Sequence, residues 1–532
     1  MRRFKKDFSE VAIARCEASG PELKECLRKS VELIGGVGKY IKPTDTVFIK
    51  PNLTAGMPAS TGGTTDVFFT EAVVELVKES GAARIVVGEC SGNESRSIES
   101  LTNCGYKDMC ERQGVEMIDL DYAEFVDVRV ENPGYRDTLR LPKVFWESDV
   151  YISVPVLKTH VSACITVAIK NSFGLIPDHD KMNAHRDQAI EKIIADIASV
   201  KPADLIFVDG RLGAEGIAGG SDFDHPIRAN LIVVGNDPVA IDAVSARLMM
   251  QNTRVRHVQW AAEQGAGNDN LDYIIIKGLS IDEAKVRYMS PAEQVAGASG
   301  GKVKICELGA CSLCCASVGG PFYRYSKNPS SLLAPVDVVT GPGDWEVPER
   351  VNPRTVLLGD CIQERYRGLG KFVGGCPVNV REYMKAMGEY DIACIKCEKA
   401  VLNALEQINN AVNADTPAGP TDADGHGADV SGDSSRDIND YSDITAALPR
   451  MRILASGKSV YQGENNKAGM DDYLYAAGKC LEGYIRNHGR RVHKISDIDV
   501  SEFSVYKGGC PITEADVIDG LRELAQKMDP DK

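Results

Sequence analysis

The 532-residue chain has the composition of an ordinary folded protein, with 43% hydrophobic and 26% charged residues. Its formal net charge of -15 argues against a general nucleic-acid binder, which needs a basic surface to displace counterions. No apolar run is long enough for a signal peptide or a membrane span, so we expect a cytoplasmic protein without membrane or nucleic-acid partners.

Short β-branched apolar runs alternate with helical patterns up to about residue 280. Continuous apolar runs are typical of strands buried on both faces of a parallel sheet. Such runs cover residues 44–52, 83–90, 148–156, 203–210, 229–236 and 271–278. Helical patterns lie between them at 70–82, 97–114, 187–200 and 237–250. The alternation predicts an α/β fold with a doubly wound, mostly parallel sheet in two lobes.

A second, smaller α/β unit is expected to begin near Lys302, with strands in GKVKICELGA, PVDVVTG and PRTVLLGDC. The segment 413–440 is rich in Asp, Gly and Ser and poor in large apolar residues, which predicts a flexible linker. Beyond it, helices are expected near 471–487 and 514–528. The predicted domains are an α/β domain over 1–300, a cysteine-rich α/β iron–sulfur domain over 301–412, the linker over 413–440, and a segment over 441–532 that completes the iron–sulfur domain.

Sixteen cysteines in a chain without a signal peptide favour metal or redox chemistry over disulfide bonds. Cys311 and Cys314 form a C-x-x-C pair after the first strand of the second unit. Cys361 follows a later strand, and Cys376 lies in a GGCP turn. Because the carboxyl ends of neighbouring strands meet at one edge of an open α/β sheet, these loops can bring four thiolates together. Four thiolates are the ligands of a [4Fe–4S] cluster, so we expect one such cluster, with oxygen sensitivity and an anaerobic host.

The order of these motifs is similar to that in the cluster-binding domain of nickel–iron hydrogenase small subunits, over roughly residues 302–390. GCPV stands here where that family usually has GCPP. Cys510, in YKGGCPITE, is an alternative fourth ligand. Cys394 and Cys397 form another C-x-x-C pair. They are alternative ligands of the first cluster or ligands of a second cluster. A four-cysteine zinc site and a redox-active dithiol use the same residue type and stay open.

Polar residues stand just beyond several of the expected strands, where α/β proteins place their ligands. Lysine binds carboxylate or phosphate as a point charge, and histidine carries protons, so these residues predict a site for a small anionic molecule. We assign Lys158 and His160 as catalytic residues. The ligand-binding residues assigned are Lys50, Asn52, Lys170, Asn171, Asp209 and Asp237. Asp237, which precedes Pro238, also fits a helix N-cap.

A second resemblance covers the N-terminal half. VFIKPNL, ISVPVLKTH, TVAIKNSFG, IFVDG, AEG and GNDPVAIDA are similar, in this order, to the family catalogued as domain of unknown function 362. The resemblance spans roughly residues 10–280, and it implies a partner module, because family members often carry a cysteine-rich iron–sulfur domain. The turn that usually reads GDS is GEC here, with Glu89 and Cys90.

These features predict an iron–sulfur oxidoreductase or electron-transfer protein that acts on a small anionic molecule or a redox protein partner. One alternative is a non-redox acid–base enzyme of the racemase or lyase type with a structural cluster. Another is a non-catalytic carrier. A redox role requires a reversible cluster potential, whereas an acid–base enzyme keeps its activity when the cluster is lost.

Overall fold

The computed structural model describes residues 7–54, 56–91, 96–219, 223, 225–251, 254–314 and 335–387, and four strands between 451 and 507. Cys394, Cys397 and Cys510 lie outside the described residues, as do the expected linker and the expected helix at 514–528. The chain divides into two compact units, Met1–Glu389 and Tyr390–Lys532. Within the described residues, no helix combines the length and apolarity that a membrane crossing requires.

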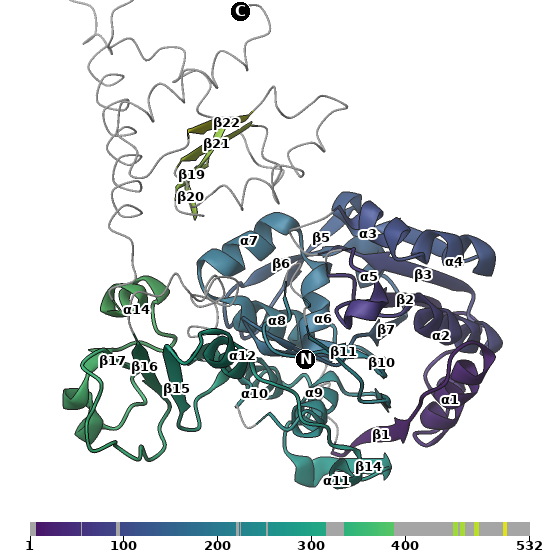
Figure 1. The fold of residues 1–532 in the computed structure, drawn as a ribbon. Helices are drawn as coiled ribbons and strands as arrows, with labels where there is room; N and C mark the ends of the chain where they lie inside the picture. Colours follow the sequence, from purple (N-terminus) through teal and green to yellow (C-terminus); the bar gives the residue numbers. More distant parts are fainter. Residues whose placement is uncertain are drawn as a thin grey trace, which may run out of the picture. The chain divides into compact units, whose positions relative to one another are not determined.

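The first unit is built on one eight-stranded sheet (Figure 1). In spatial order its strands are β14 (Ile274–Gly278), β1 (Ser9–Arg15), β13 (Leu231–Gly235), β10 (Leu205–Gly210), β7 (Val150–Val154), β2 (Thr46–Pro51), β3 (Arg84–Glu89) and β4 (Glu116–Asp119). β13 runs antiparallel to its two neighbours, and the other pairings are parallel. The α/β class with a large, mostly parallel sheet is therefore confirmed. One sheet stands in place of the two expected lobes, because β13 pairs with both β10 and β1 and so joins all eight strands.

Helices cover both faces of this sheet, because successive strand side chains point to opposite faces. Val47 and Ile49 pack in one apolar core and Phe48 in the other. The first core includes α1 (Pro21–Glu32), α2 (Val67–Glu79), α3 (Ser97–Asn103) and α4 (Tyr106–Gln113). The second includes α6 (Ala168–Asn171), α8 (Ile190–Val200), α9 (Pro238–Leu248) and α10 (Arg256–Glu263). The helix expected over 97–114 is interrupted at Gly105, whose φ of 80° is left-handed and ends a helical turn.

Smaller elements surround the sheet. The remaining helices of this part are α5 (Lys143–Trp146), α7 (Asp178–Arg186), α11 (Ile281–Ala284) and α12 (Pro291–Ala298). Three antiparallel pairs are β5 (Phe125–Arg129) with β6 (Thr138–Pro142), β8 (Lys158–His160) with β9 (Cys164–Thr166), and β11 (Gly213–Ala214) with β12 (Pro226–Ile227). The hairpin of β8 and β9 carries both residues that the sequence analysis assigned as catalytic.

A second sheet in the same unit is fully parallel, and its strands lie in chain order (Figure 1). The strands are β15 (Val303–Glu307), β16 (Val336–Thr340), β17 (Thr355–Leu358) and β18 (Lys371–Val373), followed by α14 (Val380–Met387). β15, β16 and β17 coincide with the three strands expected in this region. Val339 and Leu357 pack with Trp345, Ile362 and Tyr366 in a separate small core.

The described part of the second unit is a four-stranded sheet. In spatial order its strands are β20 (Lys458–Gln462), β19 (Met451–Ala455), β21 (Tyr473–Ala477) and β22 (Ser504–Lys507). β21 lies where a helix was expected at 471–487, so that expectation is wrong over these five residues. Its two tyrosines favour an extended strand, and this preference outweighs the helical pattern of the segment.

Candidate functional site

Four lysines gather at the carboxyl edge of the large sheet. Lys50 ends β2 and forms a buried ion pair with Glu89, which ends β3. Its ammonium also donates to the carbonyl of Pro51 at 3.0 Å and to Asn171 Oδ1 at 3.4 Å. Glu89 Oε2 accepts from the backbone N–H of Leu53 at 2.9 Å. Burial lowers the pKa of Lys50, and the carboxylate of Glu89 opposes that shift.

Lys158 is 1% exposed and is held by neutral acceptors. Its ammonium donates to Thr54 Oγ1 at 2.9 Å and to the carbonyl of Gly63 at 2.7 Å. Burial, and then the charge of Lys170, hold the pKa of Lys158 well below its usual value. Asn52, another assigned residue, donates to the same Thr54 hydroxyl at 3.3 Å.

Lys170 lies in α6, and its side chain is only partly buried. Its Nζ sits 4.5 Å from the ring centroid of Phe173. Burial, together with the charges of Lys181 and Lys50, lowers the pKa of Lys170 to about 7. The hydrogen bonds and ion pairs of the described residues include no acceptor for this amine. Its neighbour Asn171 donates to the Lys50 carbonyl at 3.1 Å and to Ser153 Oγ at 2.9 Å.

His160 is buried in β8 at the same place. Its Nδ1 accepts from the backbone N–H of Ser162 at 3.0 Å, so the ring carries its proton on Nε2. Burial, and then the charges of Lys170 and Lys158, hold the pKa of His160 well below its usual value. The imidazole is therefore neutral at physiological pH and can donate one proton.

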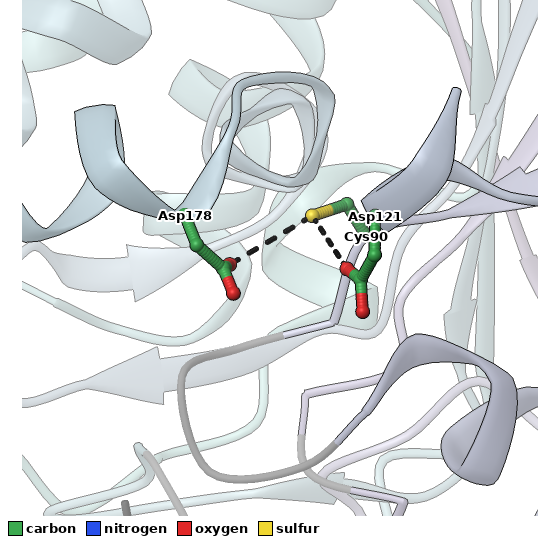
Figure 2. Close-up of side chains that lie close together, drawn as sticks. All are labelled: Cys90, Asp121 and Asp178. Carbon is green, nitrogen blue, oxygen red and sulfur yellow. Dashed lines mark hydrogen bonds between the residues drawn. The ribbon is translucent and has the colours of Figure 1, made fainter. Parts of the chain in front are cut away.

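The thiol of Cys90 lies between the carboxylates of Asp121 and Asp178 (Figure 2). Its Sγ donates to Asp121 Oδ1 at 3.2 Å and lies 3.9 Å from Asp178 Oδ1. One ligand atom of each residue lies within 4.8 Å of the others, which is a donor set for a metal ion. The ammonium of Lys181 already occupies this position, because it lies 2.8 Å from the Cys90 sulfur. Burial raises the pKa of Cys90, so its thiol is protonated.

The sequence placed Lys181 and Cys90 among the polar residues near strand ends but not among the assigned site residues, and it gave no role to Asp121 or Asp178. Lys181 also donates to the carbonyls of Cys90 at 2.8 Å and Ser91 at 3.0 Å, directly after β3. The altered GEC turn was the one signal for this group. The lysine and aspartates come from α7 and from turns near the sheet edge, and their meeting there is a product of the fold.

Asp209 and Asp237, which the sequence analysis assigned to ligand binding, make other contacts in the structure. The carboxylate of Asp209 accepts from Arg211 Nε at 3.0 Å and from its terminal nitrogen at 2.9 Å, and Arg211 also pairs with Asp66. Asp237 follows β13, the reversed strand, so it lies at the opposite edge of the sheet from Lys50. There it caps α9 by accepting from the N–H groups of Val239 and Ala240 at 2.9 and 3.0 Å. The structure does not bring Asp237 to the lysines, because strand direction decides which edge a residue joins.

The four cysteines assigned to the cluster lie in loops at the carboxyl edge of the small sheet. Cys311 and Cys314 follow β15, Cys361 follows β17, and Cys376 follows β18. The Cys314 thiol donates to Cys311, and this bond lowers the pKa of Cys311 to about 6, with help from backbone N–H groups. Burial, and then the charges of Cys311 and Cys376, raise the pKa of Cys361, which reflects the closeness of the three sulfurs.

Glycines make room around these sulfurs. Gly359 has a φ of 97°, and a Cβ on it would lie 3.3 Å from Cys314 Sγ and 3.5 Å from Cys361 Sγ. The backbone N–H of Gly341, which follows β16, donates to Cys361. The loops of all four strands therefore contribute thiols or backbone donors to one place.

The cysteine loops dock on the large sheet's helices. Ser312 Oγ donates to Glu191 Oε2 at 2.6 Å and accepts from the N–H of Arg256 at 2.9 Å. Cys164 of β9 lies in one small apolar cluster with Ala310 and Cys314, and its Sγ donates to the Ser312 carbonyl at 4.0 Å. Cys164 also pairs with His160 across the hairpin. A single β-hairpin thus contacts the cysteine group at its turn and carries Lys158 and His160.

Parts of this chain are similar to known proteins. The thylakoid-associated protein sll1697 of Synechocystis sp. (strain ATCC 27184 / PCC 6803 / Kazusa) is 29% identical over 224 residues, which are 41% of this chain and 67% of that protein. A solved structure, the lactate racemase apoprotein from Thermoanaerobacterium thermosaccharolyticum, gives a TM-score of 0.32 at 9% identity, over 72% of this chain and 87% of that one. Residues 47–247, which contain the four lysines, match the family described as Domain of unknown function (DUF362).

Proposed function

We propose that this chain is an iron–sulfur oxidoreductase in which Cys311, Cys314, Cys361 and Cys376 hold a [4Fe–4S] cluster. The observation that carries the proposal is the convergence of these four residues at one edge of a parallel sheet. Such a cluster, when bound, supplies one-electron transfer. The small anionic substrate binds at the four lysines, and a redox protein partner delivers or accepts electrons at the cysteine loops.

The surroundings of the sulfurs support this proposal. Hydrogen bonds to cluster sulfurs tune the reduction potential, and backbone N–H groups of Leu313, Cys314 and Gly341 already donate to cysteine sulfur. The space beside Gly359, which a side chain would fill, lies between two of the sulfurs. These features fit a bulky group held by several thiolates.

The shared hairpin supports electron transfer between the two sites. Cys164 shares an apolar cluster with Cys314, contacts the Ser312 carbonyl of the cysteine loop, and pairs with His160 across the hairpin. A substrate held by Lys158 and Lys170 therefore lies near the cysteine group. In this proposal the substrate gains electrons and takes up the Nε2 proton of His160. The lysines balance the negative charge of the substrate.

The pKa of Lys170, which is lowered to about 7, favours a second candidate, a non-redox acid–base enzyme. A neutral amine near pH 7 can remove a proton from the carbon next to a carboxylate. In that case the cluster, or a zinc ion at the same cysteines, has a structural role only.

The first experiment is anaerobic purification of the full chain, followed by iron, sulfide and zinc analysis and EPR spectra before and after dithionite. About four irons per chain and a signal that appears on reduction are expected for one cluster. About eight irons would add a second cluster, with Cys394, Cys397 and Cys510 as its ligands. Zinc without iron, or neither metal, would refute the redox proposal.

Matched variants assign the cluster to its ligands. Cys311→Ser should lose the EPR signal, whereas Cys26→Ser, in α1, should keep it.

Proton–deuterium exchange of 2-hydroxy and 2-oxo acids in D2O, followed by NMR, separates the two candidate functions. Exchange by cluster-free Cys311→Ser protein would favour the acid–base enzyme.

A further inference from the structure

We infer that Lys170 is a nucleophilic amine that forms a Schiff base with a small carbonyl compound bearing an anionic group, such as a 2-oxo carboxylate or a phosphorylated aldehyde. The inference rests on the proposed function only in that the same lysines hold the anionic group. It requires no electron transfer and no cluster.

The first argument is that the other three lysines are already committed. Lys50 pairs with Glu89, and Lys158 donates to Thr54 and Gly63. Lys181 donates to Cys90 and Ser91. Within the described chain, Lys170 has the ring of Phe173 beneath its amine and no hydrogen-bond acceptor. Because its side chain is only partly buried, an entering molecule can reach the amine.

The second argument is electrostatic. Schiff-base lysines are activated by desolvation or by a neighbouring cation, and Lys170 has both, with Lys50 and Lys181 as the cations. Its pKa of about 7 leaves roughly half of the amine unprotonated at neutral pH, whereas an ordinary lysine is almost wholly protonated. An amine must be unprotonated to attack a carbonyl carbon.

The third argument concerns the anionic group. Thr64 and Thr166 have buried hydroxyls with no partner among the described residues. Thr166 stands directly opposite Lys158 in the β8–β9 ladder, and Thr64 follows Gly63, whose carbonyl binds Lys158. These two hydroxyl groups and the amine of Lys158 can donate hydrogen bonds to the oxygens of a carboxylate or phosphate.

The chemical step balances without a redox partner. Lys170 Nζ attacks the carbonyl carbon, the carbon–nitrogen bond forms, and the carbonyl oxygen takes up a proton. The nitrogen gives up its two protons, one to restore the group that protonated the oxygen and one to the new hydroxyl group, which leaves as water and gives the imine. His160, whose charge state Lys170 perturbs, carries a proton on Nε2 and is the group that protonates the oxygen.

Reductive trapping on the full chain tests the inference. Sodium cyanoborohydride converts an imine into a stable secondary amine, which peptide mass spectrometry locates. With pyruvate or glycolaldehyde phosphate as probe, Lys170 should be labelled on the order of 100-fold faster than the exposed Lys29 at pH 7. The labelling rate should rise with pH through a midpoint near pH 7, as the amine of Lys170 deprotonates.

The two probes identify the anionic group, because faster labelling by pyruvate indicates a carboxylate and faster labelling by glycolaldehyde phosphate a phosphate. Lys170→Arg keeps the charge and should abolish this label, whereas Lys29→Arg should leave it unchanged. The wild-type peptide map alone names the labelled residue, so poor folding of a variant does not affect the result. Even labelling across exposed lysines with both probes, or a midpoint near pH 10, would overturn the inference. Four irons without a Lys170 label refute only the Schiff base, and the label without iron refutes only the redox proposal.

Discussion

Lys50 and Glu89 form a buried ion pair, and each residue stabilises the charge of the other. Their side chains are 1% and 2% exposed, so each charge is stabilised by the other and by nearby polar groups rather than by water. Glu89 also accepts the backbone N–H of Leu53, which holds the loop after β2 against the end of β3. The ion pair therefore helps to shape the edge of the sheet at which the other lysines meet.

Removing one partner of this pair should be costly. We expect Lys50→Met to lower the free energy of unfolding by about 3–5 kcal/mol, because it leaves the Glu89 charge buried and unpaired. Lys50→Met combined with Glu89→Gln should recover a large part of that loss. Urea unfolding followed by circular dichroism measures both.

The exposed pair of Lys39 and Glu10 provides the control for this experiment. Lys39→Met should cost less than about 1 kcal/mol, because solvent screens the pair. Equal losses for Lys50→Met and Lys39→Met would show that burial does not determine the strength of the first pair.

At the scale of elements, one buried network joins three helices to the cysteine loop. His257 of α10 lies between Glu191 of α8, at 3.0 Å, and Asp242 of α9, at 3.8 Å. Asp242 also accepts from the N–H groups of Ala168 and Ile169, which begin α6. Since Ser312 donates to Glu191, the network also positions the loop that carries Cys311 and Cys314.

The network should make stability depend on pH. Burial alone would lower the pKa of His257, but Asp242 and Glu191 outweigh burial and raise it. A raised pKa in the folded state contributes stability that is complete below the unfolded value of about 6.5 and is lost as pH rises through the folded value. The difference in unfolding free energy between wild type and His257→Asn should therefore be largest at pH 6 and shrink toward pH 9. A difference that stays constant over this range would contradict the ion-pair role.

At the scale of the whole molecule, the described cysteine group lies within the first compact unit. The unit Met1–Glu389 contains Cys311, Cys314, Cys361 and Cys376 together with the lysines. The cytoplasmic location, the redox partner and the predicted domain boundaries stay predictions.

A chain ended after Glu389 tests whether this unit suffices for the proposed cluster. It should retain about four irons per chain and the EPR signal of the full protein, because all four proposed ligands remain. Cys376→Ser in the shortened chain should remove the signal. Loss of iron from a shortened chain that still folds, judged by circular dichroism, would instead indicate that Cys510 or the Cys394–Cys397 pair supplies a ligand.

Much of the architecture could be read from local pattern. The continuous apolar runs at 44–52 and 203–210 predicted buried strands, and β2 and β10 are there, because burial on both faces leaves a direct mark on the sequence. Lys50, Lys158 and Lys170 were expected near strand ends, and the structure brings them together. The three strands expected before and between the cysteines are also present as β15, β16 and β17.

The direction of β13 could not be predicted from the sequence pattern, since parallel and antiparallel strands can bury the same side chains. That direction places Asp237 at the far edge of the sheet as a helix cap. Similarly, Lys181, Cys90 and Asp121 are up to 91 positions apart in the chain, and they meet only when α7 packs over the end of β3. Residue type and periodicity are local properties and determined the elements and the candidate chemistry. Strand direction and long-range contacts arise from packing the whole chain, so tertiary structure alone decided which charged groups meet.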